Sequence, residues 1–374
     1  MNNYSLKFNS NGKFKILVAS DLYEKTDNKN KQSILKSIDT KVFLEASIKA
    51  LSPDLVVFNG DCAFGDSDEQ LFDSVETITS TIKKLNIPLA VVFGDDEKDN
   101  NIKNKLKSLY SKYENCLFNN DKITMSENGD YNVLIEDSNG NVKFNLWFFD
   151  SNGKTPNSDI SAKYDWIHDE QIEWYENKAL QIKNENSAVV PSFVFQHIPV
   201  VEEYNLMREA KALESSKTIK GDGFYKDKYF LPNDNISGNF RDPIGCSDFN
   251  NGQFESWKNI GDVKAAFFSN SHLYDFEGYV DDILLSQCCA SGFFGCHDGD
   301  RCGIKLITIN EKDLSFDTKN FYFFDFGIES KSVAKIDQRF TSKQKRNIAL
   351  ASATLGTALT GIIKLRKILK NKRK

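Results

Sequence analysis

The sequence has few cysteines, and they do not stand in pairs. Its 374 residues include seven cysteines, an odd number without the regular spacing of a disulfide framework. Short Cys-x₂₋₄-Cys pairs, which are typical of structural zinc sites, are missing as well. These absences argue against a disulfide-stapled extracellular scaffold and favour a reducing compartment.

Histidine is scarcer still, with four in the whole chain. His168 stands at the start of a predicted helix, and His297 lies in the segment "QCCASGFFGCHDGDRCG", which we interpret as a loop. His197 in "FVFQHIPV" and His272 in "FFSNSHLYDF" each follow an apolar run. We therefore take these last two as the imidazoles available to a functional site.

Long apolar runs and a secretory signal are also missing. The amino terminus lacks an apolar signal segment and runs directly into a strand-like stretch, so we expect a cytoplasmic protein. The uncharged stretch 348–363 has sixteen residues, whereas a spanning helix needs about 20. It lies between lysines and arginines, and we predict a short helix that spans a membrane, lies on its anionic surface or docks on the body.

Charge is divided unevenly between this tail and the rest of the chain. The net charge of the whole chain is −5. Residues 343–374 hold ten Lys and Arg and no acidic residue, so residues 1–342 carry a net charge of −15. An acidic body argues against nucleic acid as a partner. A basic tail fits an anionic membrane instead, so we divide the chain into a domain, 1–330, and a tail, 331–374.

The pattern of apolar residues predicts an α/β protein. Strand-like runs at 13–20, 54–59 and 88–93 alternate with helical patterns at 35–51 and 68–86. A hairpin, a helix at 169–184 and further strands at 264–269, 282–287, 303–309 and 320–325 follow, and 214–256 reads as surface loops. Two mixed β-sheets packed face to face with helices outside would accommodate this order.

Acidic residues stand where the first three strands end. Asp21, Asp61 and Asp95 each follow an apolar run, and the carboxyl ends of parallel strands meet at one sheet edge. Together with His197 and His272 they would supply the carboxylate and imidazole donors of a metal centre.

Two longer stretches carry a family resemblance. "FQHIPVVEEYNLM" and "NNGQFESWKNIGDVKAAFF" resemble the calcineurin-like metallophosphoesterases, in the branch related to purple acid phosphatases. The resemblance covers nearly all of 1–330 and implies a four-layer αββα sandwich. It also implies metal ligands at Asp21, Asp61, His197 and His272, with Asn270 in place of a further histidine.

Several positions depart from the family pattern. Tyr23 stands where the family has a histidine, and Phe64 replaces the tyrosine that binds ferric iron in purple acid phosphatases. In "VVFGDDEKD" the family has Gly-Asn-His-Asp. If two residues are deleted, the metal-binding Asn and the catalytic His are both lost; if they are substituted, Asp95 replaces the Asn and Asp96 the His. Either alignment removes the imidazole that assists the leaving group.

These departures from the family pattern lead to three functional hypotheses. The first is a metallophosphoesterase fold with lost or strongly reduced hydrolysis, a pseudophosphatase with a binding or scaffold role. The alternative is an active metal-dependent phosphatase or phosphodiesterase with an oxygen-rich centre; a membrane-tethered adaptor is the third. The cofactor would be a divalent metal (Mn, Mg, or Fe and Zn) or none, and the partner a phosphate-ester small molecule or a phosphoprotein.

Overall fold

The first sheet brings the amino-terminal strands together with the last two strands. The computed structural model describes residues 5–333 except 98–99, 120–122, 124, 127–128, 156–162, 212–213, 215–217 and 242. Five strands pair in the order β15-β14-β2-β3-β4: Phe316–Tyr322, Gly303–Asn310, Lys13–Ala19, Leu55–Asn59 and Leu89–Val92. Strands β2, β3 and β4 are parallel, and β14 runs antiparallel to both β2 and β15.

The second sheet has seven strands in the order β1-β5-β6-β7-β11-β13-β12. Their bounds are Leu6–Lys7, Tyr131–Glu136, Val142–Phe148, Ser192–Phe195, Val263–Phe268, Ile283–Gln287 and Glu277–Val280. Strands β6, β7, β11 and β13 are mutually parallel, β5 pairs antiparallel with β6 but parallel with β1, and β12 pairs antiparallel with β13. Both sheets are therefore mixed, as predicted.

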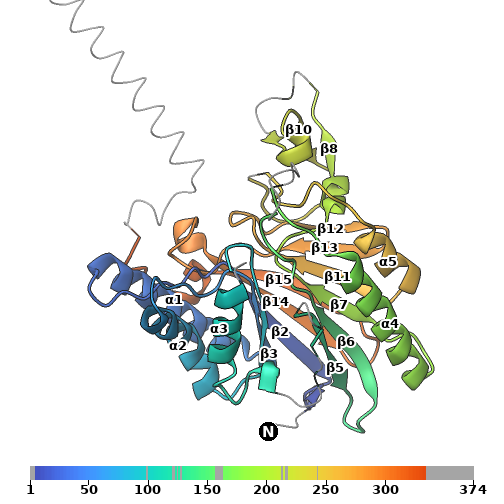
Figure 1. Ribbon diagram of the computed structural model, residues 1–374, viewed down its shortest axis with the longest axis horizontal. Helices are drawn as coiled ribbons and strands as arrows, with labels where there is room; N and C mark the ends of the chain where they lie inside the picture. The colour runs from blue at the N-terminus through green and yellow to red at the C-terminus, as the bar shows by residue number, and fades with distance from the viewer. Residues whose placement is uncertain are drawn as a thin grey trace, which may run out of the picture.

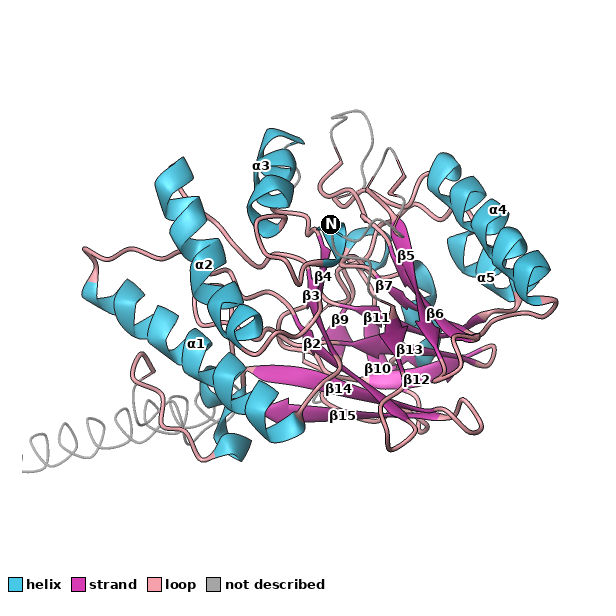
Figure 2. Cartoon of the chain, turned by 90° about the horizontal axis from the view of Figure 1, so that it is seen from below, coloured by secondary structure: helices cyan, strands magenta, loops and turns pink. Residues whose placement is uncertain are grey.

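Helices cover the outer faces of the two sheets (Figures 1 and 2). On one side lie α1 (Lys31–Leu51), α2 (Asp68–Lys84) and α3 (Asn100–Tyr110), and on the other lie α4 (Asp169–Asn186) and α5 (Gln253–Ile260). One apolar core fills the space between the sheets, and one more lies under each helical layer. This arrangement confirms the four-layer sandwich.

Strand β2 shows how one segment serves two cores. Ile16 and Val18 belong to the core between the sheets, whereas Leu17 and Ala19 pack under the helices. Successive side chains of a strand point to opposite faces, so a strand buried on both sides must be apolar throughout. This requirement explains the continuous apolar runs that end at the acidic residues.

The segment 214–256 is more ordered than the loops that the sequence predicts. It contains β9 (Ile219–Lys220) and β10 (Tyr229–Pro232), which pair with β8 (Met207–Glu209) in a three-stranded sheet. Residues 223–225 form a 3-10 turn, and α5 begins at Gln253. The prediction failed because these strands are short and surrounded by Gly, Asn and Asp.

Two further predictions need correction. The expected strand at 320–325 lies earlier, at Phe316–Tyr322, and Phe323–Phe326 form a 3-10 turn. Helix α3 has no counterpart among the predicted helices. Its sequence, "NNIKNKLKSLY", is mostly polar, and it contributes only Leu106 and Tyr110 to the fully buried core.

The end of the described chain is attached to helix α1. The Asp39 carboxylate accepts hydrogen bonds from the backbone N–H of Lys331 and Ser332 and from the Ser330 hydroxyl. The predicted apolar helix at 348–363 and the rest of 334–374 lie outside the described residues. None of the helices in the described part of the chain combines the length and apolar character needed to cross a membrane.

Candidate metal centre

Three aspartates stand at the carboxyl ends of β2, β3 and β4. Beyond the strands, the Asp21 N–H donates to the Gly60 carbonyl at 3.0 Å and the Tyr23 N–H to the Asp61 carbonyl at 2.9 Å. The loops that follow β2 and β3 thus continue the pairing of the parallel strands. This pairing brings Asp21 and Asp61 to one edge of the sheet, and Asp95 reaches the same edge from β4.

The seven-stranded sheet supplies the imidazoles. His197 follows β7, and His272 lies in the loop after β11, which is the neighbouring parallel strand. The His197 Nδ1–H donates to the Asn59 carbonyl at 2.9 Å, and the His272 Nδ1–H to the Cys296 carbonyl at 3.0 Å. A backbone carbonyl at Nδ1 leaves Nε2 as the free ring nitrogen, as is usual for histidines that bind metals.

The carboxylates surround the free nitrogen of His197. His197 Nε2 lies 3.4 Å from Asp61 Oδ2, 3.5 Å from Asp95 Oδ1 and 3.9 Å from Asp21 Oδ1. His272 Nε2 lies 3.3 Å from the same Asp21 oxygen. Two ligand atoms that each lie about 2.1 Å from one ion are at most about 4.2 Å apart. Every one of these distances is therefore compatible with a shared ion.

Two of these atoms have no hydrogen-bond partner. Asp21 Oδ1 and His197 Nε2 are buried and make no hydrogen bond, and their nearest polar contacts are the charge contacts of 3.3–3.9 Å given above. Leaving a buried polar atom unpaired is unfavourable, so such atoms mark a place where a cation fits. Asp21, Asp61 and His197 each offer one ligand atom within 4.8 Å of the others. The donor set present therefore fits a divalent metal.

The backbone at this edge adopts a conformation that few residues tolerate. Asp21, Tyr23, Asp61 and Asn270 have φ angles of 48°, 47°, 52° and 64°, in the left-handed region. Each such residue costs about 1–3 kcal/mol, and the surrounding structure must stabilise it. Strain of this kind is typical of functional sites.

Two glycines allow the close approach of the site's side chains. A Cβ atom on Gly60 would lie 2.2 Å from His197 Nδ1, and one on Gly94 would lie 2.2 Å from Asp61 Oδ1. Neither position has room for a side chain. Gly60 also has a φ of 95°, which L-residues rarely adopt.

Tyr23 occupies the side of Asp61 that faces the solvent. Its hydroxyl donates a hydrogen bond to Asp61 Oδ2 at 2.7 Å and lies 3.1 Å from Asp96 Oδ2. The ring stacks on Phe64, with centroids 5.0 Å apart, and lies against His272. Burial and the charge of Asp61 raise the pKa of Tyr23 far above its ordinary value, so the phenol keeps its proton.

Asp95 and Asp96 share an ammonium group. Lys154 Nζ lies 3.3 Å from Asp95 Oδ2 and pairs closely with Asp96 Oδ1. Asp95 is buried, with 5% of its side chain exposed, while 39% of Asp96 is accessible. Burial opposes ionisation of Asp95, but His197 and Lys154 outweigh it and hold the pKa of Asp95 below its ordinary value.

The imidazoles respond to the same carboxylates. Burial alone would lower the pKa of His272, but Asp21 raises it to about 11. Burial likewise opposes a charge on His197, whose pKa Asp61 and Asp21 raise well above its ordinary value. Without metal, each ring therefore carries a second proton, at Nε2, which a bound cation would have to displace.

Asn270 is oriented differently from the other predicted ligands. Its amide nitrogen donates to the Gly245 carbonyl at 2.7 Å, and this nitrogen would lie only 2.8 Å from a Cβ atom on Gly245. The side chain is therefore engaged with the loop around Gly245. The structure therefore brings Asp21, Asp61, Asp95, His197 and His272 together, whereas the amide of Asn270 is bound to the loop around Gly245.

Two residues at the site had not been predicted. The buried Glu97 carboxylate accepts hydrogen bonds from the N–H groups of Gly94, Asp61 and Cys62 at 2.8–3.3 Å, which ties the β4 loop to the β3 loop. Its place in the acidic run "GDDE" was the only available signal. Lys154 lies in a loop after β6, and nothing in the surrounding sequence marks it.

The cysteines do not form a second site. Among the described residues, no cysteine joins a group of His, Cys, Asp and Glu side chains close enough to hold a metal. His297 Nδ1 accepts the Gly299 N–H at 3.0 Å, which is a local loop contact. This placement agrees with the interpretation of the segment 287–303 as a loop.

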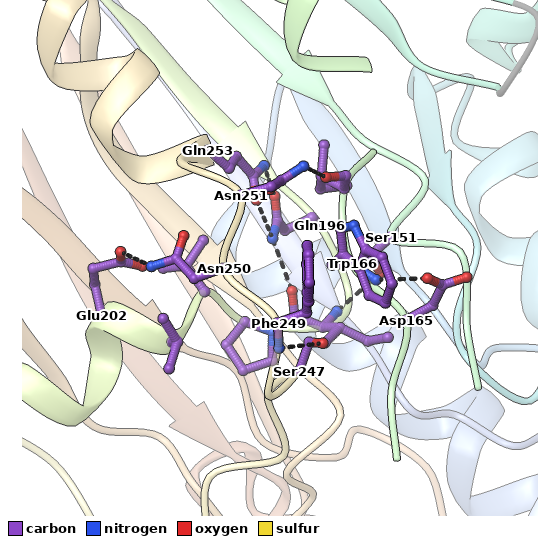
Figure 3. A pocket seen from close by; sticks show the side chains of 15 residues that line it. Ser151, Asp165, Trp166, Gln196, Glu202, Ser247, Phe249, Asn250, Asn251 and Gln253 are labelled. Carbon is purple, nitrogen blue, oxygen red and sulfur yellow. Dashed lines mark hydrogen bonds between the residues drawn. The ribbon is translucent and has the colours of Figure 1, made fainter. Parts of the chain in front are cut away.

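A pocket lies beside the centre and has a different lining. Figure 3 shows Gln196, the residue before His197, among Trp166, Phe249 and Gln253. Gln253 Nε2 donates to Gln196 Oε1 at 2.7 Å, and Gln196 Nε2 donates to the Ile198 carbonyl at 2.8 Å. The polar groups of Gln196 are therefore paired within the protein, unlike Nε2 of His197.

Known proteins are similar in sequence to most of this chain. No protein-family model matches the sequence. The chain is 25% identical over 321 residues to "Probable inactive purple acid phosphatase 28" of Arabidopsis thaliana, covering 79% of this chain and 74% of that protein. It is also 25% identical over 338 residues to "Probable inactive purple acid phosphatase 29" of the same plant, covering 82% and 80%. The chain is therefore similar over most of its length to proteins named as probable inactive purple acid phosphatases.

A solved structure also resembles this metallophosphoesterase homologue. A dimetal phosphatase from Danio rerio has a TM-score of 0.46 and 12% sequence identity, covering 82% of this chain and 98% of that one. The family resemblance expected from the sequence motifs is confirmed by the sequence relatives.

Proposed function

We propose that this metallophosphoesterase homologue binds a divalent metal and phosphate esters but hydrolyses them weakly or not at all. One observation carries the proposal: the position of the family's catalytic histidine holds no group that can act as a general acid. Asp96 is the residue nearest to it, and its carboxylate is paired with Lys154 and within reach of the Tyr23 hydroxyl.

Neither neighbour replaces the missing imidazole. Asp96 offers a carboxylate in an ion pair with Lys154 where the family has an imidazole. Tyr23 has a proton, but a pKa far above neutral makes it a poor donor to a leaving oxygen. An ester with a poor leaving group would therefore be hydrolysed slowly even with metal bound.

The metal would be held by Asp21, Asp61 and His197, with His272 as a further donor. When bound, it would supply Lewis-acid activation of an ester phosphoryl group and of water. The donors are richer in oxygen than a typical zinc site, which favours magnesium or manganese over zinc and iron. The unpaired Asp21 Oδ1 and His197 Nε2 support retention of the metal.

The same unpaired atoms favour the second candidate function, an active phosphatase or phosphodiesterase. A site that had lost all function could have closed these atoms with hydrogen bonds inside the protein. Such an enzyme would prefer esters with good leaving groups, for which acid assistance matters least. Its substrate would be a small phosphate ester or a phosphoprotein, and the basic tail would bring it to an anionic membrane.

The experiment combines metal content with turnover. Protein purified without chelators is analysed for bound metals and assayed with an activated aryl phosphate in Mg²⁺, Mn²⁺ and Zn²⁺. We expect bound metal, binding of orthophosphate by calorimetry, and turnover no greater than that of the Asp61→Asn variant. Turnover that is clearly above background and is abolished by Asp61→Asn would overturn the proposal in favour of the active enzyme.

A further inference from the structure

Within the described residues, Lys154 is the only lysine or arginine that the structure places in an ion pair with the aspartates of the centre. It comes from the loop after β6, and 40% of its side chain is exposed. The backbone of Lys154 pairs with Tyr164 in an isolated antiparallel bridge, which fixes where the side chain begins. The ammonium reaches the centre from the solvent side.

The Lys154 ammonium contacts one carboxylate oxygen of Asp95 and one of Asp96, and the second oxygen of each faces another side chain. Asp95 turns Oδ1 toward His197 Nε2, at 3.5 Å, and Oδ2 toward Lys154, at 3.3 Å. Asp96 turns Oδ1 to Lys154 and Oδ2 to the Tyr23 hydroxyl. Two of these four oxygens therefore face the Lys154 ammonium, the third faces the Tyr23 hydroxyl, and the fourth faces His197.

We propose that the Lys154 ammonium takes the place of a second metal ion, so that the centre holds one divalent metal and one fixed lysine charge. The inference rests on the proposed function, because it assumes that the Asp21, Asp61 and His197 set binds metal. It adds that each chain binds one metal ion and that Lys154 determines this number.

Charge balance supports one metal. Asp21, Asp61, Asp95 and Asp96, one ammonium and one divalent ion leave a single net negative charge when both imidazoles are neutral, not counting Glu97, whose carboxyl group is bonded to three backbone N–H groups. A second divalent ion would make the site net positive unless the ammonium left. A tethered charge at contact distance competes strongly with a dilute ion, because its effective concentration is high.

The ligands of a second metal are also incomplete. Asn270 stands where the family resemblance places a further histidine, and its amide nitrogen is bound to the Gly245 carbonyl. Asp95 could serve a second ion only through the oxygens that now face His197 and Lys154. A second ion would thus have to displace Lys154 to gain ligands.

The experiment counts metal ions in the full-length protein. Wild type, Lys154→Met and Lys154→Arg are stripped with a chelator, titrated with Mn²⁺ by calorimetry and analysed for bound metal. Electron paramagnetic resonance provides a second measurement, because two Mn²⁺ ions that share Asp61 interact magnetically and one does not. Lys163→Met is the matched control, since Lys163 pairs with Asp222 in the same region, 3.4 Å apart and away from the aspartates of the centre.

We expect one Mn²⁺ per chain in wild type, Lys154→Arg and Lys163→Met, and two in Lys154→Met with a coupled spectrum. Two ions in wild type, or one ion in folded Lys154→Met, would overturn the inference while leaving metal binding intact. No bound metal in wild type would instead reject the proposed function and the inference with it. If Lys154→Met does not fold, Lys154→Gln, which keeps a polar group, replaces it in the same comparison.

Discussion

The Tyr23 hydroxyl donates a 2.7 Å hydrogen bond to Asp61 Oδ2, the same oxygen that lies 3.4 Å from His197 Nε2. A phenol thus occupies part of the space from which the carboxylate would bind metal. The other oxygen, Oδ1, accepts the Asp96 N–H at 3.2 Å. Asp61 is therefore stabilised by hydrogen bonds within the protein, whereas Asp21 Oδ1 makes no hydrogen bond and has only the charge contacts with His272 and His197.

Removing this hydroxyl should lower the folding stability of the metal-free protein and raise its affinity for metal. In Tyr23→Phe the metal-free protein loses a hydrogen bond to a buried carboxylate, and we expect it to be destabilised by about 1–3 kcal/mol. Because the hydroxyl no longer competes for Oδ2, Mn²⁺ should raise the melting temperature more than it does in wild type. Thermal denaturation with and without Mn²⁺ measures both effects.

Tyr279→Phe is the control for the loss of a hydroxyl, since 57% of Tyr279 is exposed and it lies on β12. It should change neither stability nor the response to Mn²⁺. If Tyr23→Phe lowers the metal response instead, the phenol is a metal ligand and not a competitor.

Much of the centre could be predicted because its residues end buried strands. The apolar runs before Asp21, Asp61 and His197 are needed for cores on both faces of a sheet, so the point where polarity returns marks the sheet edge. The same reasoning places Asp95. The family resemblance then orders these residues and adds His272.

The residues that were not predicted act through contacts distant in sequence. Lys154 meets Asp95 and Asp96 from the other sheet's loops, and no local pattern encodes that meeting. Glu97 works by accepting backbone N–H groups, which is a role visible only in three dimensions. Asn270 was predicted as a ligand from its position, while its hydrogen bond to Gly245 depends on how a distant loop folds.

Restoring the family's residues should restore chemistry in a specific way. The variant Tyr23→His, Asp95→Asn, Asp96→His and Asn270→His adds imidazole donors and a general acid, and it removes the partners of Lys154. We expect tighter Mn²⁺ binding and a gain in hydrolysis of roughly 10²–10⁴-fold, the usual contribution of a general acid. Steady-state assays with an alkyl and an activated aryl phosphate measure the gain.

The alkyl ester is the informative substrate, because its leaving oxygen needs a proton most. A larger gain for the alkyl than for the aryl ester is the expected result. Equal gains would mean that metal occupancy, and not the acid at position 96, limits the wild-type protein. No gain in metal binding would contradict the placement of the centre.

Glu203 should make stability depend on pH. Its carboxyl group is buried, accepts one hydrogen bond from Gln287 Nε2 at 2.8 Å and leaves Oε1 without a partner. Burial raises the pKa of Glu203 from 4.5 to about 8. Between these values the folded chain keeps a proton that the unfolded chain releases, so the free energy of unfolding falls as pH rises.

Denaturant unfolding at pH 5, 7 and 9 tests this dependence. Each pKa unit corresponds to about 1.4 kcal/mol, so the decline for wild type should be measurable. Glu203→Gln, which cannot ionise, should flatten the decline and be the more stable protein at pH 9. The exposed Glu173→Gln should follow wild type. An identical slope for Glu203→Gln and wild type would show that Glu203 is not the responsible group.

Glycine should be required at position 60 because a Cβ atom there would collide with His197, and not only because of the backbone conformation of Gly60. Alanine at Gly60 would suffer both a φ of 95° and a Cβ atom 2.2 Å from the His197 ring. Gly140 has a similar φ of 86°, but nothing lies within 4 Å of its would-be Cβ. Gly140→Ala should therefore cost about 1–2 kcal/mol through backbone strain alone.

Gly60→Ala should cost more, because the His197 ring cannot move without losing its hydrogen bond to the Asn59 carbonyl. It should also lose Mn²⁺ binding, whereas Gly140→Ala should bind as wild type does. Chemical denaturation gives the two free energies, and calorimetry gives the two affinities. Equal destabilisation with intact metal binding in both variants would show that His197 can be displaced without consequence, which would remove it from the metal centre.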